Sequence, residues 1–436
     1  MAGGMIGRIQ IDRQNGNKRG IITRARGTRM VNLLRDEVVA SDSLIVNGFS
    51  GSQECMEVLR IRLAQLYKDE ITEQRPVIVI GTNLTLHENP YFENVPFYHG
   101  QEVTDPEQVY YIDFRNAYYS PFLSMSATGV EKTVVLLAQN YCKRQVSEEE
   151  KTLFKGVCDL LRSCDFEVSL YNIMKLYGVN TAEPAKVASD RLYGLLKSGG
   201  FSREAELLQR EPLYFVNMKN TIAQIYEQFS LFYERNGNGI SVIQKVQEAR
   251  EKGTAMPFFC FNINDGTRRA FLEYLAGELE DISKICNPII LLKDVQIGTD
   301  GENGGSFYQY IRGSSSVSLN LFSQNCMTLF PNPGEDLMNL SGTYGCKMLL
   351  FATGLNGEVL ADALGTYQHT KIGEHEEKHK GWLDLFPQGV GKGIEKHEED
   401  WKVIRQEDIS KLKRGQCYLY DRSNNVAYHY TRLSYS

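Results

Sequence analysis

Short apolar runs alternate with helix-length amphipathic patterns in the first third of the chain. The run "SLIVN" (43–47) leads into a glycine loop and then into a helical pattern at 54–69. Two further apolar runs follow, "PVIVIG" (76–81) and "QVYYIDF" (108–114). Short apolar runs separated by helix-length segments are typical of parallel strands connected by helices. Residues 41–130 are therefore predicted to form the first half of an α/β core.

From residue 131 to residue 250 the pattern changes to long helical stretches with few apolar runs. A capping box at Ser147 and Glu150 opens the helical pattern "EEEKTLFKGVCDLLRSC". This region is predicted to be an all-helical insertion. Strand patterns return within 251–370, at 256–263, 287–295, 315–325 and 346–354, with helical patterns at 266–285 and 357–365. The sheet is expected to resume there as the second half of the core.

The two ends of the chain carry different patterns. Residues 1–40 are predicted to hold an N-terminal arm and strands, and their basic stretch "KRGIITRARGTR" is interpreted as a solvated arm rather than a nucleic-acid site. Residues 371–436 are predicted to hold a charged loop and C-terminal strands. A polar, glycine-rich stretch runs from residue 366 to about residue 400, and its middle is expected to form a mobile loop. The last segment, "GQCYLYDRSNNVAYHYTRL", is expected to form short strands.

Composition narrows the class of protein. The 42% hydrophobic and 23% charged fractions are ordinary for a folded, soluble protein. The net charge of -6 gives no general attraction to DNA. The nine cysteines include no C-x-x-C pair and are interpreted as buried thiols of a reducing cytosol. No stretch has the ~18 apolar residues of a membrane span, so a cytoplasmic location is expected, peripheral to the inner face of a membrane only through partners.

The loop after the first of these apolar runs has the frame of a phosphate-binding loop. Such a loop reads G-x-x-x-x-G-K-[ST], in which backbone N–H groups and the lysine bind phosphates and the hydroxyl binds Mg²⁺. Here the frame "GFSGSQEC" begins at Gly48, includes Gly51, and has Gln53, Glu54 and Cys55 in place of the last glycine, the lysine and the hydroxyl. The same segment is also compatible with an ordinary strand-to-helix turn that contains glycines.

Each of these substitutions opposes nucleotide binding for its own reason. A side chain at Gln53 obstructs the close approach of a phosphate to the backbone. Glu54 reverses a charge, and two like charges ~4 Å apart repel by about 4 kcal/mol at an effective dielectric constant of about 20. The thiol of Cys55 is a poor ligand for Mg²⁺. No cofactor is therefore expected, and the chain is predicted to lack ATPase activity.

Together with the second half of the chain, the order of elements resembles the conjugative type IV secretion coupling proteins, hexameric RecA-like motors that feed DNA or protein to a secretion channel. The resemblance covers most of residues 25–435 and rests on pattern and order. In that family the third strand ends in a segment similar to "YYIDFRNAYYSPFLSM" and leads into an all-helical domain. The resemblance implies an α/β, RecA-like P-loop NTPase fold with a mainly parallel sheet and an inserted all-α domain. The family's transmembrane pair has no counterpart in this pattern.

Other positions of the family are partly retained. After the helical domain the family has a strand that ends in two acids, whereas "PIILLKDVQIG" supplies Lys293 and Asp294, so that one acid is missing in either alignment. The resemblance matches Arg312 to the family's arginine and Gln324 to its sensor-like glutamine. Ligand sites of such folds lie at the carboxyl ends of strands, so Glu54 and Lys293 are hypothesised to form an ion pair in place of a nucleotide.

The resulting hypothesis is a catalytically degenerate relative of the coupling ATPases that acts as a scaffold or substrate adaptor in a conjugative DNA-transfer or type IV secretion apparatus. Its expected partners are proteins of that apparatus, including an active ATPase homologue, and the family implies an oligomer. A second interpretation is an active ATP-driven DNA translocase with a non-standard nucleotide site. That interpretation requires ATP and Mg²⁺ to bind despite Glu54.

A third interpretation is a zinc metallopeptidase. The stretch "HEEKH" satisfies H-E-x-x-H through His375, Glu376 and His379, a pattern in which two histidines one helical turn apart bind zinc and the glutamate acts as base. The flanking residues supply almost no apolar face for the helix that this site needs. A solvated loop is therefore preferred to a metal site.

Overall fold

The computed structural model of the chain describes residues 3–11, 18–26, 38, 41–49, 52–66, 75–82, 84, 109–113, 119–181, 183–229, 239–298, 305–314, 317–352, 354–364, 366–377, 391–402, 404–421 and 426–430. The chain forms two compact units. Unit 1 consists of Met1–Cys55, Gln324–Met327 and Leu337–Ser436, and unit 2 of Met56–Ser323 and Thr328–Asp336. The domain boundaries that the sequence predicts, at residues 41, 131, 251 and 371, stay predictions.

Unit 1 contains a mixed sheet in which the strands follow the order β2, β1, β13, β12, β9, β3. Strands β3 and β9 run parallel, and the other neighbouring pairs run antiparallel. The strands are β1 (Gly3–Ile11), β2 (Lys18–Arg26), β3 (Leu44–Asn47), β9 (Lys347–Phe351), β12 (Cys417–Asp421) and β13 (Val426–Tyr430). The strands predicted within residues 1–40 are present as β1 and β2, and most of the basic stretch belongs to β2, an edge strand that pairs with β1 along its whole length. Its interpretation as a solvated stretch rather than a nucleic-acid site stays a prediction.

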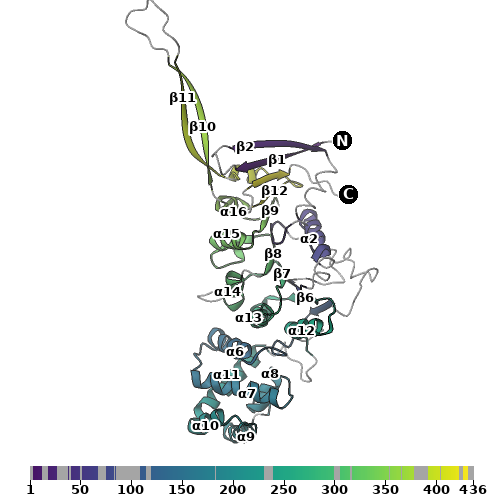
Figure 1. Ribbon diagram of the computed structural model, residues 1–436, viewed down its shortest axis with the longest axis vertical. Helices are drawn as coiled ribbons and strands as arrows, with labels where there is room; N and C mark the ends of the chain where they lie inside the picture. Colours follow the sequence, from purple (N-terminus) through teal and green to yellow (C-terminus); the bar gives the residue numbers. More distant parts are fainter. Residues whose placement is uncertain are drawn as a thin grey trace, which may run out of the picture. The chain divides into compact units, whose positions relative to one another are not determined.

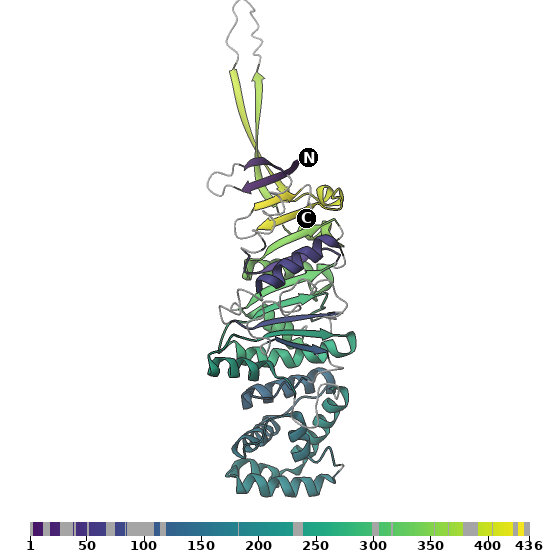
Figure 2. The same ribbon diagram turned by 90° about the vertical axis from the view of Figure 1, so that its right-hand side faces the viewer.

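A separate antiparallel pair flanks the middle of the polar stretch, where the sequence predicts a mobile loop. Strands β10 (Thr366–Glu377) and β11 (Gly391–Lys402) pair over twelve positions, from Thr366 opposite Lys402 to Glu377 opposite Gly391. Figure 1 and Figure 2 show them as a long two-stranded ribbon. The middle of the stretch, residues 378–390, lies outside the described residues, so the mobile loop stays a prediction. The sequence did not predict the two strands on either side because their composition is polar.

Unit 2 contains a parallel sheet in the order β8, β7, β4, β6, β5. The strands are β4 (Val77–Thr82), β5 (Val109–Asp113), β6 (Phe258–Ile263), β7 (Ile289–Lys293) and β8 (Ser318–Ser323). Every residue of β7 and β8 is buried, as expected of parallel strands that are covered on both faces. The mainly parallel α/β sheet that the sequence predicts is confirmed.

Six of the described helices lie between β5 and α12 (Val242–Lys252) in the chain (Figure 1). They are α6 (Ala127–Cys142), α7 (Glu148–Ser163), α8 (Leu170–Leu176), α9 (Ala185–Ser198), α10 (Ser202–Arg210) and α11 (Pro212–Phe229). The capping box at the start of α7 is confirmed, since Ser147 Oγ accepts from Glu150 N and Glu150 Oε2 accepts from Ser147 N. The remaining helices are α2 (Gln53–Gln65), α12 (Val242–Lys252), α13 (Asp265–Ile282), α14 (Gly305–Gly313), α15 (Pro333–Thr343), α16 (Gly357–Ala363), α17 (Gln406–Ser410) and the 3₁₀ turn Cys326–Thr328.

The cysteines are all free thiols, and six of the nine are buried. The expectation of buried thiols was wrong for Cys142 and Cys286, which are half-buried, and for Cys164, which is exposed at the end of α7. Burial raises the pKa of the Cys158 thiol to about 12, which keeps it protonated and unreactive. Among the described residues, no helix combines the length and the hydropathy needed to cross a membrane.

Candidate functional site

The glycine loop leaves the sheet of unit 1 at the end of β3, where Asn47 fixes its path. Asn47 Nδ2 donates to Leu355 O at 3.1 Å, and its Oδ1 accepts from Cys326 N at 3.1 Å. A Cβ atom on Gly354 would come within 2.5 Å of Asn47 Nδ2, so the chain passes too close for any side chain there. The start of the loop is therefore held by two other segments of unit 1.

The loop closes into α2 through a tight turn. Ser52 N donates to Phe49 O at 2.8 Å, and Ser52 Oγ accepts from Cys55 N at 3.3 Å, so Ser52 caps the helix. A Cβ atom on Gly48 would lie 2.4 Å from Cys55 Sγ and 3.0 Å from Phe351 Cδ2. The Cys55 thiol is thus buried against Gly48 and β9, where it is not open to a solvated metal ion.

Glu54, which the sequence pattern matches to the lysine of a phosphate-binding loop, has a side chain that is only 3% exposed. Its Oε1 accepts a hydrogen bond of 2.9 Å from Gly415 N and lies 3.9 Å from Nε of the exposed Arg414. Its Oε2 is buried without a hydrogen-bond partner among the described residues. A carboxylate in the first turn of a helix is favoured by the helix dipole, which offsets part of the cost of this burial.

The partner of Glu54 is a turn just before β12. Lys413 N donates to Gln416 Oε1 at 2.8 Å, and Gln416 N donates to Lys413 O at 2.9 Å. Gly415 has a φ of 80°, a left-handed conformation that suits glycine and presents its N–H to Glu54. Burial raises the pKa of the nearby Cys417 thiol, and the charges of Cys55 and Glu54 add to that rise. Sequence reasoning did not connect this turn with the loop.

The other predicted loop residues are less completely described. Gly51 lies outside the described residues, and Gln53 begins α2. The ion pair between Glu54 and Lys293 joins residues of different units and stays a prediction.

Lys293 and Asp294 lie at the carboxyl end of β7, in unit 2. Lys293 is the last residue of the strand and is 6% exposed, and its Nζ lies 3.4 Å from Asp294 Oδ2. Asp294 has a φ of 54°, which is uncommon for a residue other than glycine. Its carboxylate lines an open pocket of about 580 Å³ at the ends of β4, β6 and β7, together with Thr82, Ile263, Asn264, Asp265, Arg268 and Gln296. The ammonium group beside Asp294 offsets the charge that a metal ion would require.

Arg312, at the end of α14, contacts acids at the start of α15. Its guanidinium lies 3.7 Å from Glu335 and 4.0 Å from Asp336, and it donates to Tyr308 Oη at 3.2 Å. Burial raises the pKa of Tyr308, as does the hydrogen bond of 2.7 Å that it donates to Asp336. Gln324 follows β8, and its carbonyl accepts from Leu355 N at 2.7 Å.

The histidines of the zinc interpretation do not lie on a helix. His375 and Glu376 belong to β10, and His379 lies outside the described residues. Among the described residues, no group of three or more histidine, cysteine or acidic side chains is placed to hold a metal ion. The helical spacing that H-E-x-x-H requires is therefore absent at His375.

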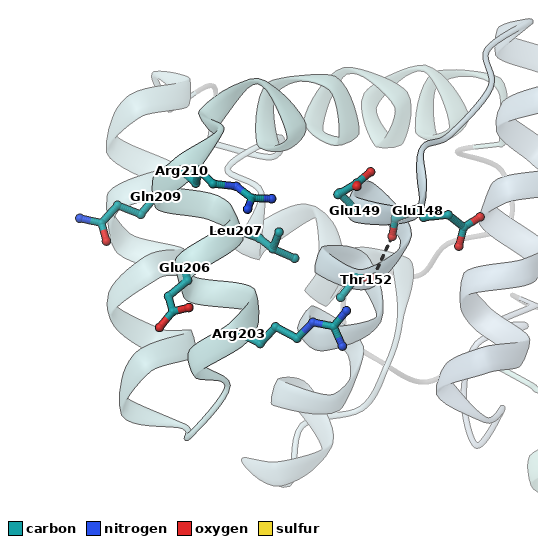
Figure 3. Close-up of a pocket in the computed structure, with 8 residues that line it drawn as sticks. All are labelled: Glu148, Glu149, Thr152, Arg203, Glu206, Leu207, Gln209 and Arg210. Atoms are coloured by element: carbon teal, nitrogen blue, oxygen red, sulfur yellow. Dashed lines mark hydrogen bonds between the residues drawn. The ribbon is translucent and has the colours of Figure 1, made fainter.

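A pocket of about 600 Å³ opens between α7 and α10, and sequence reasoning missed it (Figure 3). Its lining combines acids from the first turn of α7 with Arg203 and Arg210, which lie seven positions apart on one face of α10. The lining residues are Glu148, Glu149, Thr152, Arg203, Glu206, Leu207, Gln209 and Arg210. The mixture of carboxylates and guanidinium groups suits a polar protein surface better than a nucleotide, whose charges are all of one sign.

No protein-family model and no curated protein sequence matches the chain. Solved structures do match it. The plasmid coupling protein TrwB in complex with a non-hydrolysable ATP analogue aligns with a TM-score of 0.51 at 11% identity, over 99% of this chain and 95% of that one. The chain has the fold of a conjugative coupling protein. This coupling-protein fold confirms the RecA-like α/β architecture that the sequence predicts.

Two further TrwB structures give similar values. TrwB in complex with ADP and Mg²⁺ aligns with a TM-score of 0.49 at 10% identity, over 91% of this chain and 87% of that one. An unbound form of the bacterial protein aligns with a TM-score of 0.48 at 11% identity, over 92% and 86%. Within the coupling-protein fold, the roles of the loop residues, of Lys293 and Asp294, and of Arg312 and Gln324 stay predictions.

Proposed function

We propose that this chain is a catalytically degenerate protein with the coupling-protein fold, and that it acts as a scaffold or substrate adaptor in a conjugative DNA-transfer or type IV secretion apparatus. The chain is similar in fold to a conjugative coupling protein. Fold alone does not fix activity, so the proposal rests on the chemistry of the loop.

The observation that carries the proposal is the Glu54 carboxylate. The sequence pattern matches it to the phosphate-binding lysine, and it is buried and accepts a hydrogen bond from Gly415 N. A triphosphate in that loop would meet a fixed negative charge, at a cost of about 4 kcal/mol for each unit charge ~4 Å away. Turning Glu54 out of the way would leave the Gly415 N–H without its acceptor, which costs about 1–3 kcal/mol more.

The end of β7 supports the same conclusion. A nucleotide-hydrolysing site needs an acid there to hold Mg²⁺, and the buried Lys293 ammonium stands next to Asp294 instead. A hydrated Mg²⁺ ion would have to compete with that ammonium for the carboxylate. A nucleotide-hydrolysing site requires a positive charge in the loop and a negative charge at the end of β7. Glu54 and Lys293 supply charges of the opposite sign at these two places.

The adaptor role requires a surface for protein partners. The cleft between α7 and α10 offers both signs of charge around Leu207, which suits a polar protein segment (Figure 3). An active coupling ATPase of the same transfer system is the expected partner, because related subunits of this kind assemble through shared surfaces.

An active ATP-driven translocase is the second candidate. The observation that favours it is the match over nearly the whole chain to TrwB bound to an ATP analogue. It requires ATP and Mg²⁺ to bind despite Glu54, and it requires Arg312 or Asp294 to support hydrolysis.

One experiment separates the two candidates. The purified chain and an active coupling ATPase are examined by native mass measurement, separately and mixed, and ATP hydrolysis is measured in each sample. The adaptor proposal expects a mixed assembly and no hydrolysis by the chain alone. Hydrolysis by the chain alone that is lost in Asp294→Asn would support the translocase. If the double variant Arg203→Glu, Arg210→Glu still forms the mixed assembly, the partner does not bind at the α7–α10 cleft.

A further inference from the structure

One carboxyl group joins both ends of the helical segment to α13. Glu278 lies in the middle of α13 and is fully buried. Its Oε2 accepts from Tyr119 Oη at 2.5 Å, before α6, and its Oε1 accepts from Ile243 N at 3.1 Å, at the start of α12. Ser241 Oγ lies 2.5 Å from the same Oε1. Residues that precede and follow the six helices α6–α11 therefore meet at Glu278.

The hydrogen bonds of Ser241 determine where the proton of this cluster lies. A hydroxyl has one hydrogen to donate and two lone pairs that accept. Ser241 Oγ lies 2.8 Å from the carbonyl oxygen of Leu123, which can only accept, so the hydrogen of Ser241 goes to Leu123. Gln244 N donates to the same Oγ at 3.3 Å. The remaining contact, to Glu278 Oε1, is then a hydrogen bond only if Glu278 carries the proton and donates it.

Ionised Glu278 cannot satisfy the same contacts. Without its own proton, its Oε1 needs the hydrogen of Ser241, and that hydrogen has to leave Leu123 O. Leu123 is 3% exposed, so its carbonyl would then be buried without this donor. An unsatisfied buried carbonyl is costly, and the segment around Leu123 would move to find another donor or water.

We propose that the Glu278 carboxyl group is a proton-operated latch, which ties Leu123 to Ser241 and both to α13 when it is protonated and frees Leu123 from Ser241 when it is ionised. When Glu278 ionises, one proton leaves it for solvent, and the hydroxyl hydrogen of Ser241 turns from Leu123 O to Glu278 Oε1. No other reactant is needed.

The titration of the cluster agrees with this geometry. Burial raises the pKa of Glu278 to about 8, although hydrogen bonds that favour the charged form, including the one from Tyr119, act against this rise. The titratable group in contact with Glu278 is Tyr119, from the segment before α6, and Tyr274 of α13 acts in turn on Tyr119. Burial and the charge of Glu278 hold the pKa of Tyr119 well above its ordinary value, so Tyr119 stays neutral when Glu278 ionises.

Asp281, three positions after Glu278 on the same helix, behaves in the opposite way. Asp281 accepts from Ser126 N at 2.8 Å and from Lys284 Nζ at 2.6 Å. Burial acts to raise its pKa, but the hydrogen bonds from Lys284 and Ser126 outweigh that effect and the pKa is lowered. The Asp281 carboxylate, which accepts from the N-cap residue Ser126 of α6, therefore stays charged at neutral pH. Glu278, three positions earlier on α13, changes its charge.

Hydrogen exchange of the full-length chain tests the latch. Backbone protection of peptides covering 119–126 and 239–246 is measured from about two units below to about two units above pH 8, corrected for intrinsic exchange. The wild type is expected to lose protection in both peptides by about tenfold across pH 8. Glu278→Gln keeps a donor toward Ser241 and is expected to show no such step. Glu280→Gln, on the exposed face of α13, is the matched control and is expected to keep the wild-type step.

Two results would overturn the proposal: wild-type protection that does not change across this range, or a Glu278→Gln variant that keeps the full step. If Glu278→Gln does not fold, Tyr119→Phe takes its place. Removing a hydrogen bond that favours the charged form is expected to move the midpoint to higher pH. A midpoint in Tyr119→Phe that is unchanged or lower would also contradict the latch.

Discussion

The carboxylate of Glu54 accepts a hydrogen bond of 2.9 Å from the backbone N–H of Gly415, 361 positions later in the chain. This contact ties the start of α2 to the turn before the last strands of unit 1. In a phosphate-binding loop, the side chain at this position binds the nucleotide. Here the Glu54 side chain instead makes a contact within the protein. The contribution of this contact to stability can be measured by substituting Glu54 and its neighbours.

The Glu54 contact is expected to contribute to stability in a charge-dependent way. Glu54→Gln keeps an oxygen for Gly415 N and is expected to change the free energy of unfolding by at most about 1 kcal/mol. Glu54→Lys buries a cation next to an N–H donor and is expected to destabilise by about 3 kcal/mol. Urea unfolding followed by circular dichroism checks both values. The exposed Glu407→Gln on α17 is the control, and Glu54→Lys as stable as that control would contradict the buried contact.

The close packing of Gly48 on Cys55 predicts coupled mutations. Gly48→Ala places a methyl group 2.4 Å from Cys55 Sγ and 3.0 Å from Phe351, at a cost of about 1–3 kcal/mol. Cys55→Ala removes the sulfur, so the double variant is expected to lose less stability than the sum of the two single variants. A double-mutant cycle by chemical unfolding measures this coupling. Strict additivity would show that the loop does not pack as described.

The contacts of Arg312 predict a small effect on stability and a larger one for its buried partner. Arg312 is 44% exposed, so Arg312→Ala is expected to cost no more than about 1 kcal/mol. Asp336 is 2% exposed and accepts from Tyr308 Oη and Asn332 N, so Asp336→Ala is expected to cost about 3 kcal/mol. Thermal unfolding of the two variants ranks them. The reverse order would mean that Arg312, rather than Asp336, organises the junction of α14 and α15.

Burial of Glu278 predicts that stability falls as the pH rises. Its pKa is about 8 in the folded chain and 4.5 in a model peptide, so between these values the folded state holds a proton that the unfolded state has lost. The stabilisation is therefore complete below about pH 4.5 and decreases by up to about 1.4 kcal/mol per pH unit until about pH 8. Urea unfolding across this range, compared between wild type and Glu278→Gln, isolates the contribution. Identical slopes in the two proteins would rule it out.

The sequence predicts the sheet and the start of α7 well because the signals are local. Every residue of β7 and β8 is buried, so their apolar runs are nearly continuous. Ser147 and Glu150 form their capping box within a single helical turn. Such features need no knowledge of distant parts of the chain.

The candidate site is harder to predict because its contacts are distant in sequence. Nothing near Glu54 indicates that its partner is the N–H of Gly415, and neither residue is unusual by itself. Strands β10 and β11 were missed because their composition is polar and only their mutual register identifies them. Glu278 carried a usable signal, since it falls on the apolar stripe of α13 at helical spacing from Phe271 and Ile282, where a carboxyl group is unexpected.

The central claim is that the chain does not bind ATP. Its most direct test is a calorimetric titration of the wild-type chain with ATP in the presence and absence of Mg²⁺. Because Glu54 is buried in the loop and Lys293 stands beside Asp294, no saturable binding is expected in either condition. Saturable, Mg²⁺-dependent binding of ATP that is weakened by Glu54→Ala would contradict the account.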